Sequence, residues 1–390
     1  MKLLTVITLL LLSFSCTSAS QGRGDSTFCA NDTLPDTTAV QRITLLFAGD
    51  LMQHKEQLNK ALQADGTYNY ADCFEPIKEA IGQADFAIGN LEVTLGGKPY
   101  TGYPTFSAPD AYAAALQAAG FDVLLTANNH CLDRRKRGLE RTIRQLDSLQ
   151  IRHLGTYIDK EQRDLHHPLL LEKNGFRIAL LNYTYGTNGI PLTAPNIVNY
   201  IDKTLIAEDI KAAQAMQPDA IIACMHWGIE YQSLPSREQQ AMANWLLQQG
   251  VTHVIGSHPH VVQPMELRTD SLTKQQHVVV YSLGNFISNM SARKTDGGVL
   301  FKLELTKDST MRVSHCEYQL VWTARPALTR TKNFVLYPVD AAPDSLPAAA
   351  LNWLKIFTND TRKLFSKHNV GIEENTFFKK KSPNYLQNKR

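Results

Sequence analysis

The sequence has no marked excess of charge of either sign. Its 390 residues include 40 Lys and Arg and 37 Asp and Glu, which gives a formal net charge of +3 at pH 7. The basic residues are scattered, except for runs at 134–137 and 377–381, which a solvated helix start and a frayed terminus explain. A protein that binds nucleic acid through electrostatic attraction needs a stronger basic bias, so no nucleic-acid partner is expected.

The sequence also lacks internal repeats and low-complexity inserts, and its N-terminal apolar run is too short to span a membrane. This run covers residues 3–12 and follows Lys2, which is typical of a secretory signal. Cys16 comes just after it and resembles the lipidated cysteine of a bacterial lipoprotein, although Ser13 stands where Leu is usual. We predict a signal peptide over residues 1–16 with Cys16 as a lipid anchor; a plain cleavable signal or an uncleaved anchor is the alternative.

Residues 17–41 are rich in Ser, Thr, Asp and Gly, a composition that cannot bury enough apolar area to fold. We interpret them as a flexible tether, and the RGD at 23–25 as part of it. The main domain is predicted over residues 42–335, followed by a helical segment and polar tail over 336–390. The protein is thus expected to be exported and held in the cell envelope, attached to the membrane through its N-terminus.

There is no CxxC pair. The chain has six cysteines, and removal of Cys16 leaves five, so at least one should lack an internal partner. Cys224 lies inside an apolar strand-like run and Cys131 follows a candidate site histidine. We expect both to be buried free thiols.

The rest of the sequence has ordinary globular composition, with 43 % hydrophobic and 20 % charged residues. Apolar strand-like runs alternate with helical segments, which is the βαβ rhythm of a mostly parallel sheet covered by helices. The expected strands are 43–49, 85–92, 121–127, 176–184, 219–227 and 252–257, and the expected helices are near 54–64, 110–119, 134–149, 203–216 and 236–250. From residue 277 three strand-like segments follow with short connections, and we expect antiparallel hairpins that form the second sheet of a layered domain.

Five segments, far apart in the chain, each leave a strand-like run and end in a side chain that can bind metal. In an open α/β sheet, residues beyond the carboxyl ends of the strands meet in one crevice. These residues are Asp50 in LLFAGD, Glu92 in FAIGNLE, His130 in VLLTANNH, His226 in IIACMH, and His258 and His260 in VIGSHPH.

The first two strand exits supply oxygen ligands. Asp50 follows Gly49, a residue that lets the backbone bend so that the carboxylate enters the crevice. Asn90 and Glu92 flank Leu91, so the period-two alternation of a strand directs both to the same side. Taken singly, Asp50 is also typical of a helix cap and GNLE of a turn. The other strand exits favour the interpretation as ligands.

The later exits add imidazoles. Asn129 can offer a carbonyl oxygen to a metal, while His130 beside it can act as a general acid. His226 ends an apolar strand, where a satisfied core histidine is the alternative. In an extended stretch, His258 and His260 would present both rings on one side, a common way to supply two imidazoles.

This mixed set of nitrogen and oxygen donors suits Zn, Mn or Fe better than Ca or a thiolate cluster. A bound divalent metal lowers the pKa of water toward neutrality and gives a hydroxide nucleophile without a covalent enzyme intermediate. Hydrolysis is therefore the predicted reaction class, with one or two ions as cofactor.

Six ordered motifs carry a resemblance to a known family. They are GDLM (49–52), GNLE (89–92), ANNH (127–130), HWG (226–228), GSHPH (256–260) and SLGNF (282–286). Together they resemble the bacterial capsule-synthesis CapA family, which is linked to poly-γ-glutamate capsule production and is similar in turn to the calcineurin-like metallophosphoesterases. The resemblance implies an α/β fold, a four-layer α/β/β/α sandwich.

The resemblance also implies roles for single residues. Asp50 matches the first metal-binding aspartate, and Glu92 or Asn90 takes the place of the bridging aspartate. Asn129 and His130 match the pair of metal ligand and catalytic acid, and His226, His258 and His260 match the metal-binding histidines. Met52 stands where the phosphoesterases usually have a second histidine, so a single metal or a weaker second site is the alternative to a complete dinuclear centre.

Other polar residues near the strand ends are candidates for substrate contact. These are Asn128 and Asn285, the latter being equally typical of a tight turn. Lys98, Tyr100 and Tyr103 can form a substrate lip, although plain connection explains that Gly- and Pro-rich loop as well.

The expected function is that of an exported metal-dependent hydrolase. It would act on a cell-envelope or capsule polymer, such as poly-γ-glutamate, or on its precursor, by cleavage of a phosphoester or an amide. The competing interpretation is a noncatalytic capsule assembly or anchoring protein that retains a metal. A third, histidines with a purely structural role, predicts no bound transition metal.

Overall fold

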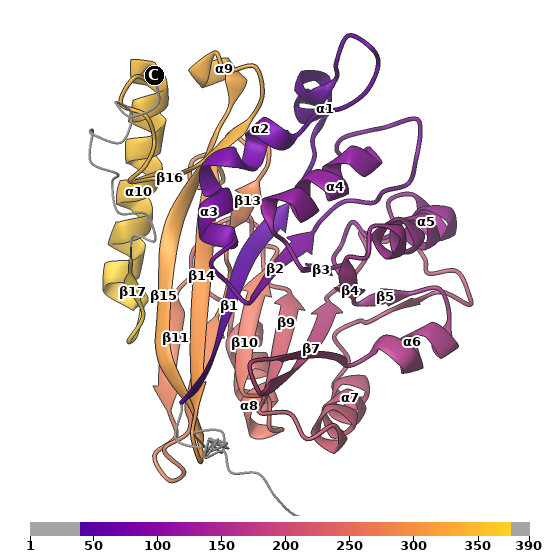
Figure 1. Ribbon diagram of the computed structural model, residues 1–390, viewed down its shortest axis with the longest axis vertical. Helices are drawn as coiled ribbons and strands as arrows, with labels where there is room; N and C mark the ends of the chain where they lie inside the picture. The colour runs from indigo at the N-terminus through magenta and orange to yellow at the C-terminus, as the bar shows by residue number, and fades with distance from the viewer. Residues whose placement is uncertain (1–39, 376–390) are drawn as a thin grey trace, which may run out of the picture. The chain divides into compact units, whose positions relative to one another are not determined.

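The computed structural model describes residues 40–375, and these form two β-sheets with helices on their outer faces (Figure 1). The first sheet has the order β16-β15-β14-β1-β2-β3-β4, with β13 paired to β1 and β17 paired to β15. Its strands are β1 (Gln41–Leu51), β2 (Phe86–Leu91), β3 (Val123–Leu125), β4 (Arg152–Leu154), β13 (Asn285–Ile287), β14 (Gly297–Lys307), β15 (Met311–Ala324), β16 (Val335–Pro338) and β17 (Glu373–Glu374).

The second sheet has the order β11-β12-β10-β9-β7-β6. Strands β5 and β8 pair with each other and form a separate two-stranded sheet. In the second sheet β7, β9, β10 and β12 run parallel, and β6 and β11 add antiparallel edges. The strands are β5 (Thr156–Tyr157), β6 (Leu169–Lys173), β7 (Phe176–Thr184), β8 (Ile197–Val198), β9 (Ala220–His226), β10 (His253–Ser257), β11 (Met265–Thr269) and β12 (Gln276–Val280).

Helices occupy most of the longer connections between strands. They are α1 (Lys55–Ala61), α2 (Ala71–Phe74), a 3-10 turn η1 (Glu75–Ile77), α3 (Lys78–Ile81), α4 (Asp110–Ala119), α5 (Arg135–Ser148), α6 (Lys160–His166), α7 (Lys203–Ala215), α8 (Arg237–Gln248), α9 (Pro326–Thr329) and α10 (Ala348–His368).

The central strands are apolar on both faces, which explains their continuous hydrophobic runs. In β1, Ile43, Leu45 and Phe47 point into the core between the two sheets, whereas Leu46 and Ala48 point to the other face of the sheet. Because successive residues of a strand face opposite sides, a strand buried on both sides needs no polar alternation. The observed β1 thus matches the expectation for residues 43–49.

Three apolar layers fill the space between four structural layers. The middle layer joins the facing sides of the two sheets. The outer side of the first sheet packs against side chains of α1 to α4, such as Tyr112 and Leu116. The outer side of the second sheet packs against α7 and α8 through Ile206, Ile210 and Leu246. The predicted four-layer α/β/β/α sandwich is therefore confirmed.

The segment after residue 335 joins the same fold. The boundary predicted at residue 336 falls inside β16, which pairs with β15. Helix α10 places Phe357 and Phe365 in the core between the sheets, and Phe365 packs edge-on against Tyr318 of β15 with the ring centroids 4.9 Å apart. The predicted signal peptide, Cys16 and most of the predicted tether lie outside the described residues.

One topological expectation is wrong. The hairpin formed by β14 and β15 does not build the second sheet, because β14 pairs antiparallel with β1 and extends the first sheet. The second sheet is built instead on the parallel strands β7, β9 and β10, and only β12 joins it from the segment after residue 277. Strand partners this far apart in sequence are chosen by tertiary packing, which local spacing does not reveal.

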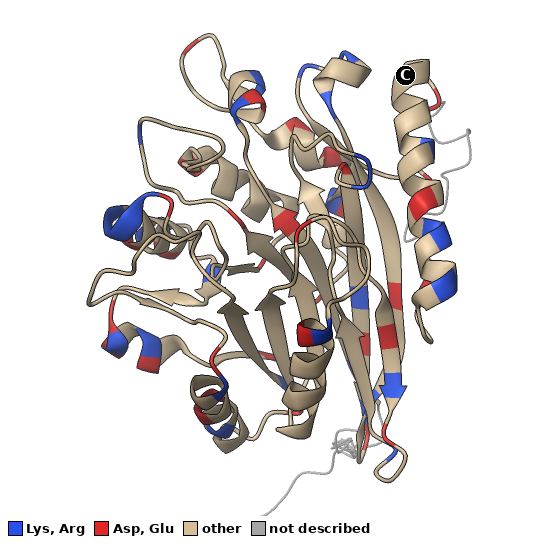
Figure 2. Cartoon of the chain, turned by 180° about the vertical axis from the view of Figure 1, so that it is seen from behind, with Lys and Arg blue, Asp and Glu red and all other residues tan. Residues whose placement is uncertain are grey.

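Charges and cysteines agree with the sequence-based expectations. Basic and acidic side chains are interspersed over the outer helices (Figure 2). Cys131 and Cys224 are buried free thiols, as predicted, and burial raises the pKa of each to about 12. Among residues 40–375, none of the helices combines the length and apolarity that crossing a bilayer requires.

Candidate metal centre

The carboxyl ends of strands from both sheets meet at one place, and the predicted ligands gather there. Asp50 lies at the end of β1 and Glu92 directly follows β2, both in the first sheet. His226 ends β9, and His258 and His260 follow β10, in the second sheet. Because these strands run parallel within each sheet, their ends share an edge. The site is therefore assembled from both sheets.

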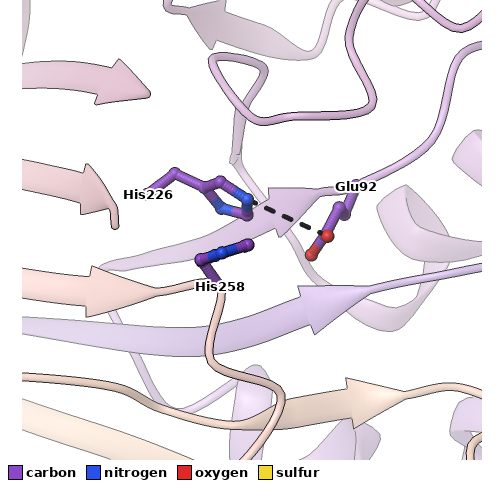
Figure 3. Close-up of side chains that lie close together, drawn as sticks. All are labelled: Glu92, His226 and His258. Carbon is purple, nitrogen blue, oxygen red and sulfur yellow. Dashed lines mark ion pairs between the residues drawn. The ribbon is translucent and has the colours of Figure 1, made fainter. Parts of the chain in front are cut away.

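Two groups of possible ligands share one carboxylate. Glu92, His226 and His258 form one group, and Asp50, Glu92 and His260 form the other. Within each group the candidate ligand atoms lie within 4.8 Å of one another, and all five residues are buried. Figure 3 shows the first group, with Glu92 and the two imidazoles converging from separate elements. Glu92 is thus the residue that the two groups have in common.

The contacts inside the groups are too long or too few to satisfy these buried atoms. Glu92 Oε1 lies 3.9 Å from His226 Nε2 and 4.0 Å from His260 Nε2. Within residues 40–375, Glu92 Oε1 and His258 Nδ1 are buried without a hydrogen-bond partner. Unpaired buried polar atoms are costly, and a cation in their midst would satisfy them. Oxygen and imidazole donors suit a divalent transition metal, so the residues present fit such an ion.

Burial sets the protonation of the ligands. It raises the pKa of the Glu92 carboxyl well above its usual range, and the negative charge of Asp50 adds to this effect. Burial lowers the pKa of His226 well below its usual range and that of His258 to about 3, helped in each case by neighbouring imidazoles. Both rings are therefore neutral at physiological pH and keep a lone pair for a metal.

His260 differs from the other two histidines. Burial again acts to lower its pKa, but Asp50, whose Oδ2 lies 3.3 Å from His260 Nδ1, together with Glu230 and Asn285 raises the pKa overall. Nδ1 also lies 3.1 Å from Asn285 Oδ1, and Asn285 Nδ2 donates to Thr295 O at 2.8 Å. Asn285 is thus held as an acceptor that orients the His260 ring and leaves Nε2 toward Glu92.

The HPH segment reaches the site in a way that the sequence did not predict. The backbone φ angles are 102° at His258 and 59° at His260, so both residues lie in the left-handed region and not in an extended stretch. Non-glycine residues rarely adopt this region, and such strain is concentrated at functional sites. The two rings still lie together, with centroids 5.9 Å apart.

Two asparagines of the predicted set hold the ligands in different ways. Asn129 Oδ1 lies 3.0 Å from His226 Nε2, so its carbonyl oxygen faces the same position as the imidazole nitrogen. Asn90 donates through Nδ2 to Asp50 Oδ1 at 2.8 Å and to Glu92 Oε2 at 3.4 Å. Asn90 therefore presents an amide N–H, which positions the carboxylates, while Asn129 presents a possible ligand oxygen.

His130 stands outside both ligand groups and has a carboxylate partner of its own. Its Nδ1 lies 2.8 Å from Asp133 Oδ2, and both side chains are buried. Asp133 also accepts a hydrogen bond from the backbone N–H of Phe106, whose ring packs edge-on against His130 at 4.6 Å. Asp133 was missed in the sequence, although its spacing of three residues from His130 was a usable signal.

The predicted substrate contacts keep that role as a prediction. Asn128 is buried, accepts a hydrogen bond from the His130 backbone N–H and donates to Leu91 O, so it shapes the loop that carries His130. Asn285 is also buried. Of the predicted lip, Tyr103 is 72 % exposed and its ring lies 6.3 Å from that of Phe106.

His54 and Tyr185 are further residues at the site that sequence reasoning left without a role. The His54 ring lies edge-on to that of Phe106 at 5.2 Å, and burial lowers the pKa of His54 to about 4. Tyr185 stacks on His226 and tilts against His258. Met52, at the position where the resemblance implied a missing histidine, is buried in the core.

Comparisons with known proteins give a family and its relatives. Residues 44–290 match the family described as bacterial capsule synthesis protein PGA_cap. The chain is 26 % identical over 290 residues to the capsule biosynthesis protein CapA of Bacillus anthracis, covering 69 % of this chain and 66 % of that protein. It is 27 % identical over 289 residues to the PGA biosynthesis protein CapA of Bacillus subtilis (strain 168), covering 68 % of each.

The chain thus spans about two thirds of the length of these curated relatives. Among solved structures it is similar to the calcineurin-like phosphoesterase YfkN from Bacillus subtilis, with a TM-score of 0.41 and 13 % identity, covering 83 % of this chain and 99 % of that chain.

Proposed function

The chain belongs to the bacterial capsule synthesis protein family PGA_cap, and from this premise we propose that it is an exported, metal-dependent hydrolase of the cell envelope. Its substrate would be a capsule or envelope polymer, such as poly-γ-glutamate, or a precursor of that polymer. The observation that carries the proposal is the buried Glu92 carboxylate, shared by two groups of ligands at the ends of strands from two sheets.

Asp50, Glu92 and His260 would hold one divalent ion, and Glu92, His226 and His258, with Asn129, a second. Zn, Mn or Fe suits these donors. When bound, such ions supply a Lewis acid and lower the pKa of the attacking water, as cleavage of a phosphoester or an amide requires.

The chain's own residues would supply proton transfer and orientation. His130 donates a proton from Nε2 to the leaving group, because its Nδ1 is engaged by Asp133 at 2.8 Å. Asp133 holds the ring in place. Asn285 and Asn90 position His260 and the two carboxylates, so that little reorganisation is needed during the reaction.

The N-terminal segment completes the proposal. An apolar run followed by Cys16 supports export and attachment to the membrane by a lipid, which would keep the hydrolase beside a polymer assembled at the cell surface. Labelling with a radioactive or alkyne-bearing fatty acid tests the anchor. Incorporation should be lost in Cys16→Ser and kept in a Cys29→Ser control.

Metal content and turnover, measured on the same preparation, test the enzymatic role. Protein purified without an affinity tag should contain a divalent transition metal by elemental analysis and should hydrolyse envelope-derived substrates. His130→Ala should lower turnover by on the order of 10²-fold or more and leave the metal content unchanged, since His130 lies outside both ligand groups. His226→Ala should lose metal and turnover together.

Two results would count against this assignment. Bound metal with no phosphodiesterase, phosphomonoesterase or amidase turnover above that of His130→Ala would favour the noncatalytic capsule assembly protein. Absence of any bound transition metal would leave the histidines with a structural role only.

A further inference from the structure

A groove of about 510 Å³ opens beside the metal centre, lined by apolar side chains of the second sheet and its helices. Tyr185 forms the wall next to the metal centre, and Trp227, Ile229 and Met242 line the groove farther along. Tyr185 is 48 % exposed and Ile229 is 49 % exposed. Exposed apolar surface of this kind, next to a reactive centre, is typical of a binding site.

Tyr185 joins the groove to the metal centre. One side of its ring faces the ligands: the centroid lies 4.5 Å from that of His258, and the ring stacks on His226 with an interplanar angle of 11° at 6.3 Å. The same residue lines the groove. A substrate group that packs on the exposed part of the Tyr185 ring would therefore lie next to His226 and His258.

Two other exposed tyrosines lie near the site, and one of them contacts a ligand. Tyr231 is 53 % exposed, its ring lies 6.1 Å from that of His260, and its backbone N–H donates to Pro259 O at 2.8 Å. Tyr103, at 72 % exposed, flanks the side of the site that carries His130. Tyr185 and Tyr231 thus place partly exposed aromatic rings against the ligand histidines.

The charges of the residues that line the groove indicate which class of molecule can bind there. None of the residues that line it is Lys or Arg, and Glu238, in the first turn of α8, is its charged member. An anionic chain would meet the Glu238 carboxylate and no basic side chain among these lining residues, whereas an aromatic face and a carboxylate acceptor suit an uncharged ring with hydroxyl groups.

We propose that this groove binds a neutral saccharide unit of the substrate, with the sugar ring stacked on Tyr185 and its hydroxyl groups donating hydrogen bonds toward Glu238. The inference rests on the proposed function and narrows its substrate to an envelope polymer, or polymer precursor, that carries uncharged sugars. It disfavours a purely anionic chain such as poly-γ-glutamate as the groove's occupant.

Binding measurements test this inference without relying on turnover. The full chain, purified with its metal, is applied to an array of neutral and acidic oligosaccharides, and affinities for the retained compounds and for a poly-γ-glutamate oligomer are measured by calorimetry. Neutral oligosaccharides should bind more tightly than poly-γ-glutamate. Because the groove residues are not ligands, the binding should persist when a chelator is present.

Variants connect the binding to the groove. Tyr185→Ala should weaken binding of the neutral oligosaccharide about tenfold, and Tyr185→Trp should retain it because an aromatic face remains. Ile229→Ser, at a position outside both ligand groups, should weaken binding without change in metal content. Leu272→Ala, at a 90 % exposed apolar residue in the turn between β11 and β12, serves as the matched control and should bind as the wild type does.

The inference is overturned if the array retains no neutral oligosaccharide, if poly-γ-glutamate binds more tightly, or if both Tyr185→Ala and Ile229→Ser bind as the wild type does. Its failure is separable from that of the proposed function. Saccharide binding without turnover would contradict only the hydrolase, and turnover on a polymer free of sugars, without saccharide binding, would contradict only the groove's assignment.

Discussion

At the scale of single residues, the pair of His130 and Asp133 makes the most direct prediction. Asp133→Asn keeps an acceptor for the Phe106 backbone N–H but removes the carboxylate that orients the imidazole through Nδ1. We expect turnover to fall by on the order of 10²-fold while metal content stays constant. Steady-state kinetics together with elemental analysis check this. Wild-type turnover in Asp133→Asn would show that His130 needs no carboxylate partner.

A second residue-scale prediction concerns His253, which is buried on β10 and accepts a hydrogen bond from the Val278 backbone N–H at 3.1 Å. Burial, with a contribution from His277, lowers the pKa of His253 from 6.5 to about 3. Below pH 6.5, His253 therefore binds a proton in the unfolded chain but stays neutral in the folded chain until the pH approaches 3. The free energy of unfolding is maintained above this pH and decreases as the pH falls toward 3.

Replacement of this imidazole should reduce the acid sensitivity of the protein. In His253→Gln the slope of the unfolding free energy against pH, between about pH 6 and pH 4, should decrease by roughly 1 kcal/mol per pH unit. Urea unfolding at a series of pH values measures it. The exposed His315 provides a control, because His315→Gln should leave the slope as in the wild type. If the unfolding free energies of His253→Gln and wild type fall equally with pH, the lowered pKa of His253 in the folded protein is contradicted.

At the scale of elements, the close approach of β1 and the turn before β13 positions Asp50. A Cβ atom at Gly49 would lie 1.9 Å from Gly284 O, and Asp50 pairs in register with Asn285. Gly49→Ala should therefore force the strands apart, lower the free energy of unfolding by about 3 kcal/mol and weaken metal binding. Gly186→Ala, where nothing lies within 4 Å, should change stability by less than about 0.5 kcal/mol. Denaturant titration of both variants decides between these outcomes.

The same scale shows what the sequence could predict. Strands β1, β7 and β9 were identified because burial on both faces leaves a continuous apolar run. Parallel pairing then brings Asp50 and Glu92 to one edge of the first sheet, and His226 ends β9 in the second sheet. The membership of β14 in the first sheet was not predictable, because its pairing with β1 joins residues about 250 positions apart and is decided by packing. Local sequence patterns therefore predict which segments form strands, but not which strands pair with each other.

Within the site, residue types were predictable and backbone conformation was not. Ligand types and strand exits indicated His258 and His260, but their left-handed φ angles depend on the surrounding structure and leave no signal in a single sequence. Asp133 was overlooked although it lies three residues from His130, because that spacing brings the two side chains together only in the turn that follows β3. The Tyr185 ring had no signal either, since its contacts join β7 to the residues after β10.

At the scale of the whole molecule, the ligands come from both sheets, so a bound metal ties the two halves of the sandwich together. Removal of the metal by a chelator should lower the free energy of unfolding by about 2.7 kcal/mol where the metal is present at a hundredfold excess over its Kd. Calorimetry should show one cooperative transition that shifts to lower temperature. In His226→Ala the chelator should have a smaller effect, and in His315→Ala the full effect. If the transition temperature does not change on chelation, bound metal does not stabilise the association of the two sheets.

Glu92 is common to both ligand groups, whereas Asp50 and His260 serve one of them and His226 and His258 the other. If this chain holds two ions, a descendant that comes to hold one could lose either set of partners, but not this carboxylate. Position 92 should consequently be the last of the five to vary over evolutionary time, and the four others should be lost in pairs that follow the two groups.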